Sequence, residues 1–360
     1  MAIVDELRRI LRELSPLWFS VALGTGMTAM LLHQLPYNAS AIRWIAIALF
    51  AFNIFLFCFL LVLSVLRFIL YPFLLRIVLL HNAQVFSLPL IPMSFATLIN
   101  LTVWICTPVW GPWVTILAWV LWWIDATLSF VMCSILIFGI LWTHDMRSAN
   151  MTTTWLLPFL APIVAASSGG LVAEALDQDS QVIPTLITAF VLWSVGFLPA
   201  MALIILYAHR LLEYKMPSRQ QVMSLVLPVG PFGLGSLGIQ SHNGIHGISL
   251  LTAIPFWACG LWWLVFAITS AIRARTTFNL EWWSTTFPTG ALALATVQIG
   301  RDLASDFMKI LGMVLSAGSI LLWLVCFLGT VRMMVNKSIL SSSYMAEIYP
   351  HTQGTRRSSV

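Results

Sequence analysis

The stretch Trp155-Leu-Leu-Pro-Phe-Leu-Ala-Pro-Ile-Val-Ala-Ala-Ser-Ser-Gly-Gly170 is apolar and uncharged, yet two prolines and a glycine pair interrupt it. Irregular backbone is tolerated in a bilayer only where protein or a water-filled cavity satisfies its polar groups. The stretch therefore predicts a membrane segment that is buried inside a protein. Four other segments share its properties, namely residues 18–32, 88–104, 223–239 and 282–299.

Five longer apolar segments without such clusters alternate with the interrupted ones, at residues 42–71, 114–142, 184–210, 250–272 and 307–335. They are rich in Leu, Ile, Val, Phe and Trp, which suit a lipid-facing position. Interrupted segments at corresponding places in a repeat point to a translocation site. The pattern predicts an all-α integral membrane fold of ten transmembrane helices, arranged as five helical hairpins, with an inner ring of five kinked helices around a central pore. Alternatively, the small residues only allow close helix packing.

The composition agrees with a membrane fold, because 60% of the 360 residues are hydrophobic and only 9% are charged. A span needs about 20 apolar residues, and ten such segments, together with their short loops, use nearly the whole chain. We therefore expect a cytosolic N-terminal segment (residues 1–15), one ten-helix transmembrane transporter domain (16–335) and a cytosolic tail (336–360).

The basic residues predict the orientation. With a cytosolic N-terminus, ten spans place all but Arg43, Arg301 and Lys309 of the 18 Lys and Arg residues on the cytosolic side. Membrane proteins carry an excess of Lys and Arg in their cytosolic loops. The distribution therefore agrees with ten spans, and both termini should be cytosolic. The basic residues are too dispersed for a nucleic-acid site, and the five cysteines lack the spacing of a metal site. No metal, cofactor or nucleic-acid partner is expected.

An anion pathway must lower the cost of dehydration without trapping the ion. Neutral hydroxyls suit that task, and breaks at Gly and Pro would add backbone N–H groups and helix N-termini. The candidate pore-lining residues are Gly24, Thr25, Gly26, Phe95, Thr97, Ser167, Ser168, Phe232, Ser236, Thr286, Pro288 and Thr289, and Ser20 and Ser94 offer further hydroxyls. The alternative for each hydroxyl is a hydrogen bond to its own helix.

Asp125 is the only acid deep within an apolar span. A carboxylate there is costly unless it is paired or protonated. Asp125 could bind a coupling proton, or it could anchor its helix through a hydrogen bond to Asn53 or Asn100.

Several motifs resemble the fungal sulfite efflux pumps of the tellurite-resistance and dicarboxylate transporter family, which also includes malate transporters and slow anion channels. The matching runs begin with Ser15-Pro-Leu-Trp-Phe-Ser-Val-Ala-Leu-Gly-Thr-Gly-Met27 and Ile91-Pro-Met-Ser-Phe-Ala-Thr97. They continue with Trp110-Gly-Pro-Trp113, Leu121-Trp-Trp-Ile-Asp125, Ala161-Pro-Ile-Val-Ala-Ala-Ser-Ser-Gly-Gly170, Leu227-Pro-Val-Gly-Pro-Phe-Gly-Leu-Gly235 and Phe278-Asn-Leu-Glu-Trp-Trp283 with Thr286-Phe-Pro288.

The resemblance implies ten helices with fivefold pseudosymmetry around an anion pathway, frequent assembly as trimers, and an aromatic gate on the ninth helix. Phe287 aligns with that gate, where a ring would close the pore by sterics and dewetting. Phe95 and Phe232 occupy comparable places on their own segments.

The expected function is plasma-membrane export of sulfite or bisulfite by a homo-oligomer, a trimer by resemblance, in the lipid bilayer. A malate or C4-dicarboxylate transporter and an anion channel of the same fold are the alternatives. A dianion of that size should need a paired basic clamp, which the interrupted segments lack. No HExxH or GxSxG motif supports an enzyme.

Overall fold

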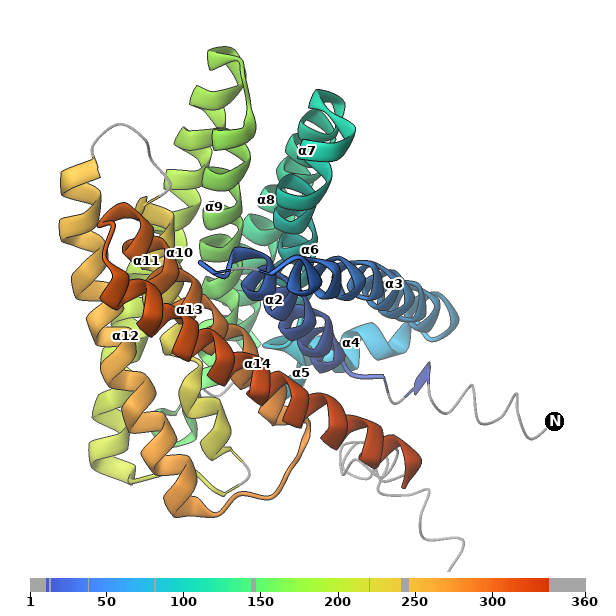
Figure 1. Cartoon of the computed structure of the whole chain (residues 1–360). Helices are drawn as coiled ribbons and strands as arrows, with labels where there is room; N and C mark the ends of the chain where they lie inside the picture. Colours follow the sequence, from blue (N-terminus) through green and yellow to red (C-terminus); the bar gives the residue numbers. More distant parts are fainter. Residues whose placement is uncertain are drawn as a thin grey trace, which may run out of the picture.

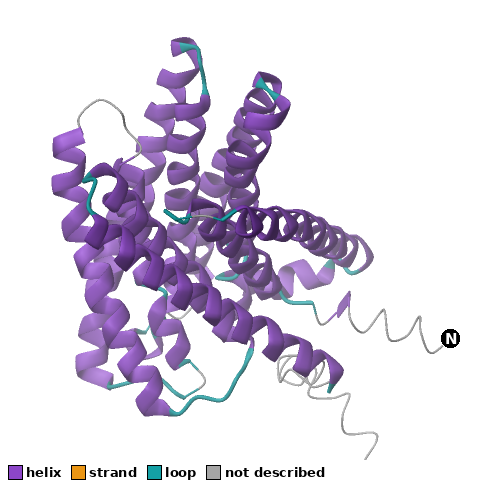
Figure 2. Ribbon diagram, in the orientation of Figure 1, coloured by secondary structure: helices purple, strands orange, loops and turns teal. Residues whose placement is uncertain are grey.

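The computed structural model describes residues 11–12, 14–37, 39–80, 82–143, 147–219, 221–240 and 246–336. Every regular element within these ranges is a helix (Figure 2). Most of the expected N-terminal segment and all but Asn336 of the expected tail lie outside the described residues.

Five helices are long. They are α3 (Ser40–Leu70), α8 (Pro112–Thr143), α10 (Asp179–Tyr214), α12 (His246–Ala274) and α14 (Asp306–Val335). Large apolar side chains are exposed along each of them, including Phe55 on α3, Ile135 on α8 and Leu321 on α14. Such surfaces suit lipid contact.

The five interrupted segments form shorter helices, and four of them begin with a 3₁₀ turn. These four are η1 and α2 (Pro16–Trp18, Phe19–Gln34), η4 and α9 (Thr153–Leu156, Leu157–Ala175), η5 and α11 (Val222–Val226, Val229–Gln240), and η6 and α13 (Leu280–Trp282, Trp283–Asp302). The fifth, α6 (Leu90–Leu101), continues through the π-helical turn η2 (Thr102–Cys106) into α7 (Thr107–Trp110). The connectors are α4 (Phe73–Leu80), α5 (Asn82–Val85) and η3 (Ser148–Asn150).

The expected breaks in the middle of these segments do not occur. Helix α2 continues through Gly24 and Gly26, α9 through Pro162 and the Gly169-Gly170 pair, and α13 through Pro288. Irregular backbone in these segments is confined to the 3₁₀ turns, to η2 and to the turns directly before α6 and α11. A buried helix tolerates these residues because its neighbours satisfy the freed backbone groups.

Seven helical stretches of the described chain are long and apolar enough to cross a membrane: Ser40–Leu70, Leu90–Trp110, Pro112–Gly139, Thr153–Ala175, Asp179–Tyr214, Ala253–Ala274 and Asp306–Val335. In its most apolar part, Thr153–Ala175 is 83% buried and Ser40–Leu70 only 28%. The short helix α9 is therefore an inner element and α3 an outer one.

Four short helices pack against the long helix that follows them: α2 on α3, α9 on α10, α11 on α12 and α13 on α14, the last pair being clear in Figure 1. Helix α8 contacts both α6 and α9. Among the short helices, α2 contacts α6, α6 contacts α9, α9 contacts α11, α11 contacts α13, and α13 contacts α2. The five short helices thus form a closed series of neighbours, in which the last helix, α13, packs against the first, α2.

Small residues bring the inner helices close together. A Cβ atom on Gly24 of α2 would collide with Thr286 of α13, and one on Gly26 would collide with Thr97 of α6. A Cβ atom on Gly233 of α11 would lie 2.8 Å from the backbone nitrogen of Leu292 on α13. Packing of these helices therefore depends on glycine, as in many membrane bundles.

Candidate functional site

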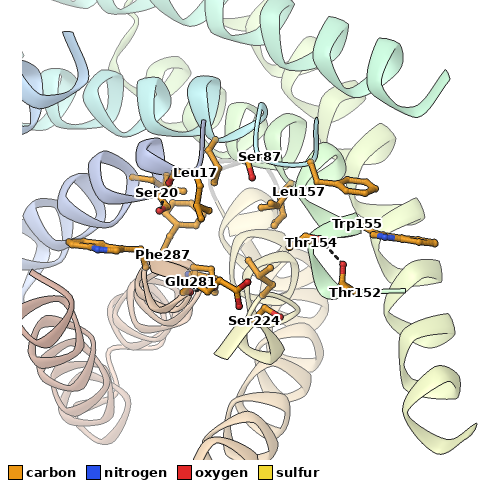
Figure 3. A pocket seen from close by; sticks show the side chains of 18 of the residues that line it. Leu17, Ser20, Ser87, Thr152, Thr154, Trp155, Leu157, Ser224, Glu281 and Phe287 are labelled. Carbon is orange, nitrogen blue, oxygen red and sulfur yellow. Dashed lines mark hydrogen bonds between the residues drawn. The ribbon is translucent and has the colours of Figure 1, made fainter. Parts of the chain in front are cut away.

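A cavity of about 260 Å³ lies where the N-terminal ends of all five short helices meet (Figure 3). A water molecule takes about 30 Å³ of liquid, so the cavity can hold several waters or a small oxyanion. It is lined by Leu17, Ser20, Leu23, Phe86, Ser87, Leu90, Met93, Asn150, Thr152, Thr154, Trp155, Leu157, Leu160, Gln221, Ser224, Leu227, Glu281, Trp283, Ser284, Phe287 and Pro288.

The lining repeats with a spacing of three residues in every segment. The first residue of each set forms what we call the cavity rim: Leu17, Ser87, Thr154, Gln221 and Glu281. Three residues later come Ser20, Leu90, Leu157, Ser224 and Ser284. Three residues further along lies the cavity floor: Leu23, Met93, Leu160, Leu227 and Phe287. Five segments thus contribute side chains in the same register.

The cavity floor is apolar and closed. Each of its five side chains is at most 3% exposed. Phe287 contributes the largest side chain of the five, and the neighbouring Pro288 also lines the cavity. An apolar constriction of this kind blocks ions by sterics and by excluding water.

Three serines above the floor make the same local hydrogen bond. Ser20 Oγ donates to the Leu17 carbonyl at 2.6 Å, Ser224 Oγ to Gln221 at 2.7 Å and Ser284 Oγ to Glu281 at 2.6 Å. Each hydroxyl is therefore held by its own segment, yet it can rotate toward a bound ion. Such donors favour weak binding.

The helix ends favour negative charge in the cavity. Helices α2, α6, α9, α11 and α13 all begin beside it. Helix N-termini carry a partial positive charge from the aligned peptide dipoles, so they attract anions. The convergence of five of them makes this cavity suitable for an anion.

A second cavity of about 200 Å³ adjoins the first and shares Asn150, Thr152, Gln221 and Ser224 with it. Arg210 lines it, and the guanidinium donates to the Lys215 carbonyl at 2.8 Å and the Ala149 carbonyl at 3.4 Å. These bonds fix a cation beside the anion-favouring cavity.

Glu281 is the acid in the lining of the first cavity. Its Oε2 atom is buried and has no hydrogen-bond partner among the described residues. Burial raises the pKa of this carboxyl from 4.5 to about 7. In the sequence, Glu281 stands out only as part of the motif Phe278-Asn-Leu-Glu-Trp-Trp283. The available signal was an acid in the first turn of an uncharged segment.

Of the candidate pathway residues, the structure brings the gate candidate Phe287, the neighbouring Pro288 and the hydroxyl of Ser20 to the cavity. Three others lie at helix contacts on α2 and α13. Thr25 accepts a hydrogen bond from Trp323 Nε1 at 3.1 Å, Thr289 Oγ1 lies 3.2 Å from Ser319 Oγ, and Thr286 lies against Gly24.

The candidates on α6, α9 and α11 also lie outside the cavity lining. Phe95 stacks on Phe57 of α3 with ring centroids 5.7 Å apart, and Phe232 packs against Gly260 of α12. Thr97 donates to the Ser94 carbonyl and lies against Gly26. Ser168 and Ser236 are fully buried, and Ser167 is half-buried.

Asp125 is fully buried on α8. Neither carboxyl oxygen has a hydrogen-bond partner among the described residues, so the expected bond to Asn53 or Asn100 is not formed. Asn53 instead lies beside the close contact at Gly26.

The comparison with known proteins gives the family. The profile described as the SLAC1 voltage-dependent anion channel matches residues 13–331. The chain belongs to the voltage-dependent anion channel family. The resemblance inferred from the motifs is thereby confirmed, and the relatives of this SLAC1-type chain are named as transporters.

Two relatives of the SLAC1-type chain are fungal sulfite efflux pumps. The sulfite efflux pump SSU1 of Arthroderma otae is 37% identical over 343 residues, which cover 90% of this chain and 92% of that protein. The pump of Trichophyton rubrum is 36% identical with the same coverage. The malic acid transport protein of Schizosaccharomyces pombe is 21% identical, over 88% of this chain and 77% of that protein.

Proposed function

We propose that this chain exports sulfite or bisulfite from the cytosol across the plasma membrane. The observation that carries the proposal is the cavity at which five helix N-termini converge above the closed apolar floor. Its chemistry suits a small oxyanion, and the sulfite efflux pumps that resemble most of the chain support that substrate.

The pathway is proposed to run between the five short helices, with the five long helices outside them, so that ten helices cross the membrane. The closed series of contacts from α2 through α6, α9, α11 and α13 back to α2 supports this arrangement. The greater burial of α9 compared with α3 supports the inner and outer roles.

The cavity is proposed to open to the cytosol, where both termini also lie. The cavity rim lies at the ends of segments where the positive-inside bias places the basic residues. Arg147, Arg210, Arg219 and Arg275 belong to that side of the sequence. A cavity that opens there can load anion from the cytosol for export.

Phe287 is proposed as the gate, together with the other residues of the cavity floor. The floor separates the cavity from the buried part of α13 beyond it, where Ala291, Leu292 and Ala295 are inaccessible. Anion would pass when Phe287 and its neighbours move apart. The neutral hydroxyls of Ser20, Ser224 and Ser284 would supply donors without trapping the ion.

A small anion fits the lining better than a dicarboxylate does. The residues that line the first cavity include no Lys or Arg, and the second cavity supplies one cation, Arg210. Two carboxylates at opposite ends of a C4 acid would need two basic contacts. Malate is therefore the alternative substrate with which sulfite is compared in the test.

The assembly is proposed to be a homotrimer, on the strength of the family resemblance. Large apolar side chains exposed on the long helices, such as Phe55 and Leu321, give the chain surfaces for lipid and for further copies.

The test is the flux of sulfite and of malate, measured side by side from loaded liposomes that carry the purified protein. Empty liposomes give the baseline. We expect sulfite to leave much faster than malate. Equal or faster malate flux would discard sulfite as the preferred substrate.

A further inference from the structure

An acidic residue faces a cavity that is otherwise suited to anions. Glu281 lies in η6, one turn before Ser284 and two turns before Phe287, and all three line the cavity. Figure 3 shows the carboxyl group of Glu281 in the space between the short helices, on the same side as Ser224. An anion within the cavity therefore lies in the same space as this group.

No described cation offsets the Glu281 charge from the elements around it. Element η6 packs against α13 and η5. Val222–Val226 of η5 has no titratable side chain, and α13 has none before Arg301 near its far end. The other lining residues are uncharged, and Arg273 and Arg275, which precede η6 in the chain, are exposed.

Arg210 is the cation in the adjoining cavity. Its guanidinium is bonded to the carbonyl groups of Lys215 and Ala149. Burial is therefore the physical cause that acts on the Glu281 carboxyl, and it raises the pKa to about 7. Below that pH the group is neutral, and above it the group is negative.

The two protonation states act on an anion in opposite ways. An ionised carboxylate at the wall of a partly buried cavity repels an oxyanion more strongly than it would in bulk water, because charges interact more strongly at a lower dielectric. A neutral carboxyl offers an O–H donor to the same oxyanion. Glu281 thus changes from a barrier to a ligand when it gains a proton.

We propose that Glu281 is a specificity-determining residue of the pathway, which contacts the oxyanion as a neutral hydrogen-bond donor and excludes it when ionised. This inference rests on the proposed function. It makes export depend on cytosolic protons at Glu281 in addition to the protonation equilibrium between sulfite and bisulfite. A pump with this residue loads its substrate best from an acidified cytosol.

The test is sulfite flux from proteoliposomes with the full chain, at about pH 6 and about pH 8 on the cavity side. Wild type is compared with E281Q, which keeps the shape of the neutral acid. A pKa of about 7 leaves roughly nine tenths of Glu281 protonated at the lower pH and roughly one tenth at the higher. The ratio of E281Q flux to wild-type flux should therefore rise about tenfold between these two pH values. The shift from bisulfite to sulfite affects both proteins equally, so it cancels in the ratio.

Two further variants sharpen the test. E213Q removes an exposed acid at the end of α10 that lies 3.9 Å from His209, and its ratio to wild type should not change with pH. E281A removes both the charge and the hydrogen-bond donor. Its flux should therefore lose the part of the pH dependence that Glu281 causes, and it should be lower than the flux of E281Q.

Each outcome decides the proposal. A ratio to wild type that rises with pH for E281Q and E281A, but not for E213Q, supports it. A constant ratio, with sulfite flux present in both proteins, overturns the role of Glu281 and leaves the proposed function standing. Flux no greater than from empty liposomes in every protein overturns the role and the proposed function together.

Discussion

At the scale of single residues, position within the cavity matters more than residue type. Phe287, Phe95 and Phe232 occupy comparable places on their segments, yet Phe287 forms part of the cavity floor while Phe95 stacks on Phe57 and Phe232 packs against Gly260. The first is therefore expected to control flux and the other two to stabilise helix contacts.

Replacing Phe287 with Ala should raise sulfite flux on the order of tenfold, which corresponds to about 1.4 kcal/mol of barrier. The physical reason is that the largest side chain of a closed apolar floor is removed. F138A is the matched control, because Phe138 on α8 is 68% exposed and faces outward. Unchanged or reduced flux in well-folded F287A would count against the gate.

The sequence located Phe287 and Pro288 but missed Glu281. The Phe-Pro pair belongs to a motif whose role the family resemblance supplied. The role of Glu281 depends on which ends of the helices enclose the cavity, and this is a property of tertiary packing. The same limit explains Thr25 and Thr289, whose hydroxyls contact side chains on α14 in place of the cavity.

At the scale of elements, periodicity and composition were enough to predict a helical chain with short and long helices in alternation. They were not enough to predict the continuity of the short helices. Gly and Pro suggest breaks in an isolated segment, whereas α2 and α9 stay helical because neighbouring helices surround them. Here glycine serves close packing, which was the alternative interpretation of the sequence.

Close packing of α11 on α13 predicts that G233A is unstable. The new Cβ atom would lie 2.8 Å from the Leu292 nitrogen and 2.9 Å from the Ala291 carbonyl carbon, and backbone atoms cannot move aside cheaply. Overpacking of about 1–3 kcal/mol should lower the melting temperature by on the order of 5 °C.

G318A is the matched control for G233A. No atom lies within 4 Å of the position of a Cβ on Gly318 of α14. Alanine also favours a helix relative to glycine, so G318A should melt at or slightly above the temperature of wild type. Equal melting of G233A and G318A would show that α11 and α13 do not approach as closely as described.

At the scale of the whole molecule, the two ends of the cavity differ. Its rim is formed by the first turns of five segments that are far apart in the sequence, and its floor is buried. The same register of lining residues in five segments agrees with a repeated hairpin as the unit of the fold. Polar groups at the rim and buried apolar groups at the floor are the arrangement that the proposed function requires of a closed state loaded from one side.

The central claim is that sulfite travels through this cavity, and blocking the cavity tests it most directly. S284C should lose nearly all sulfite flux when a charged, membrane-impermeant thiol reagent is present on both sides of the liposomes. S194C on α10 is the control, because Ser194 also bonds to its own helix but does not line the cavity. Wild type, with its cysteines either buried or on the exposed faces of long helices, reports any background. Full flux through labelled S284C would contradict the account.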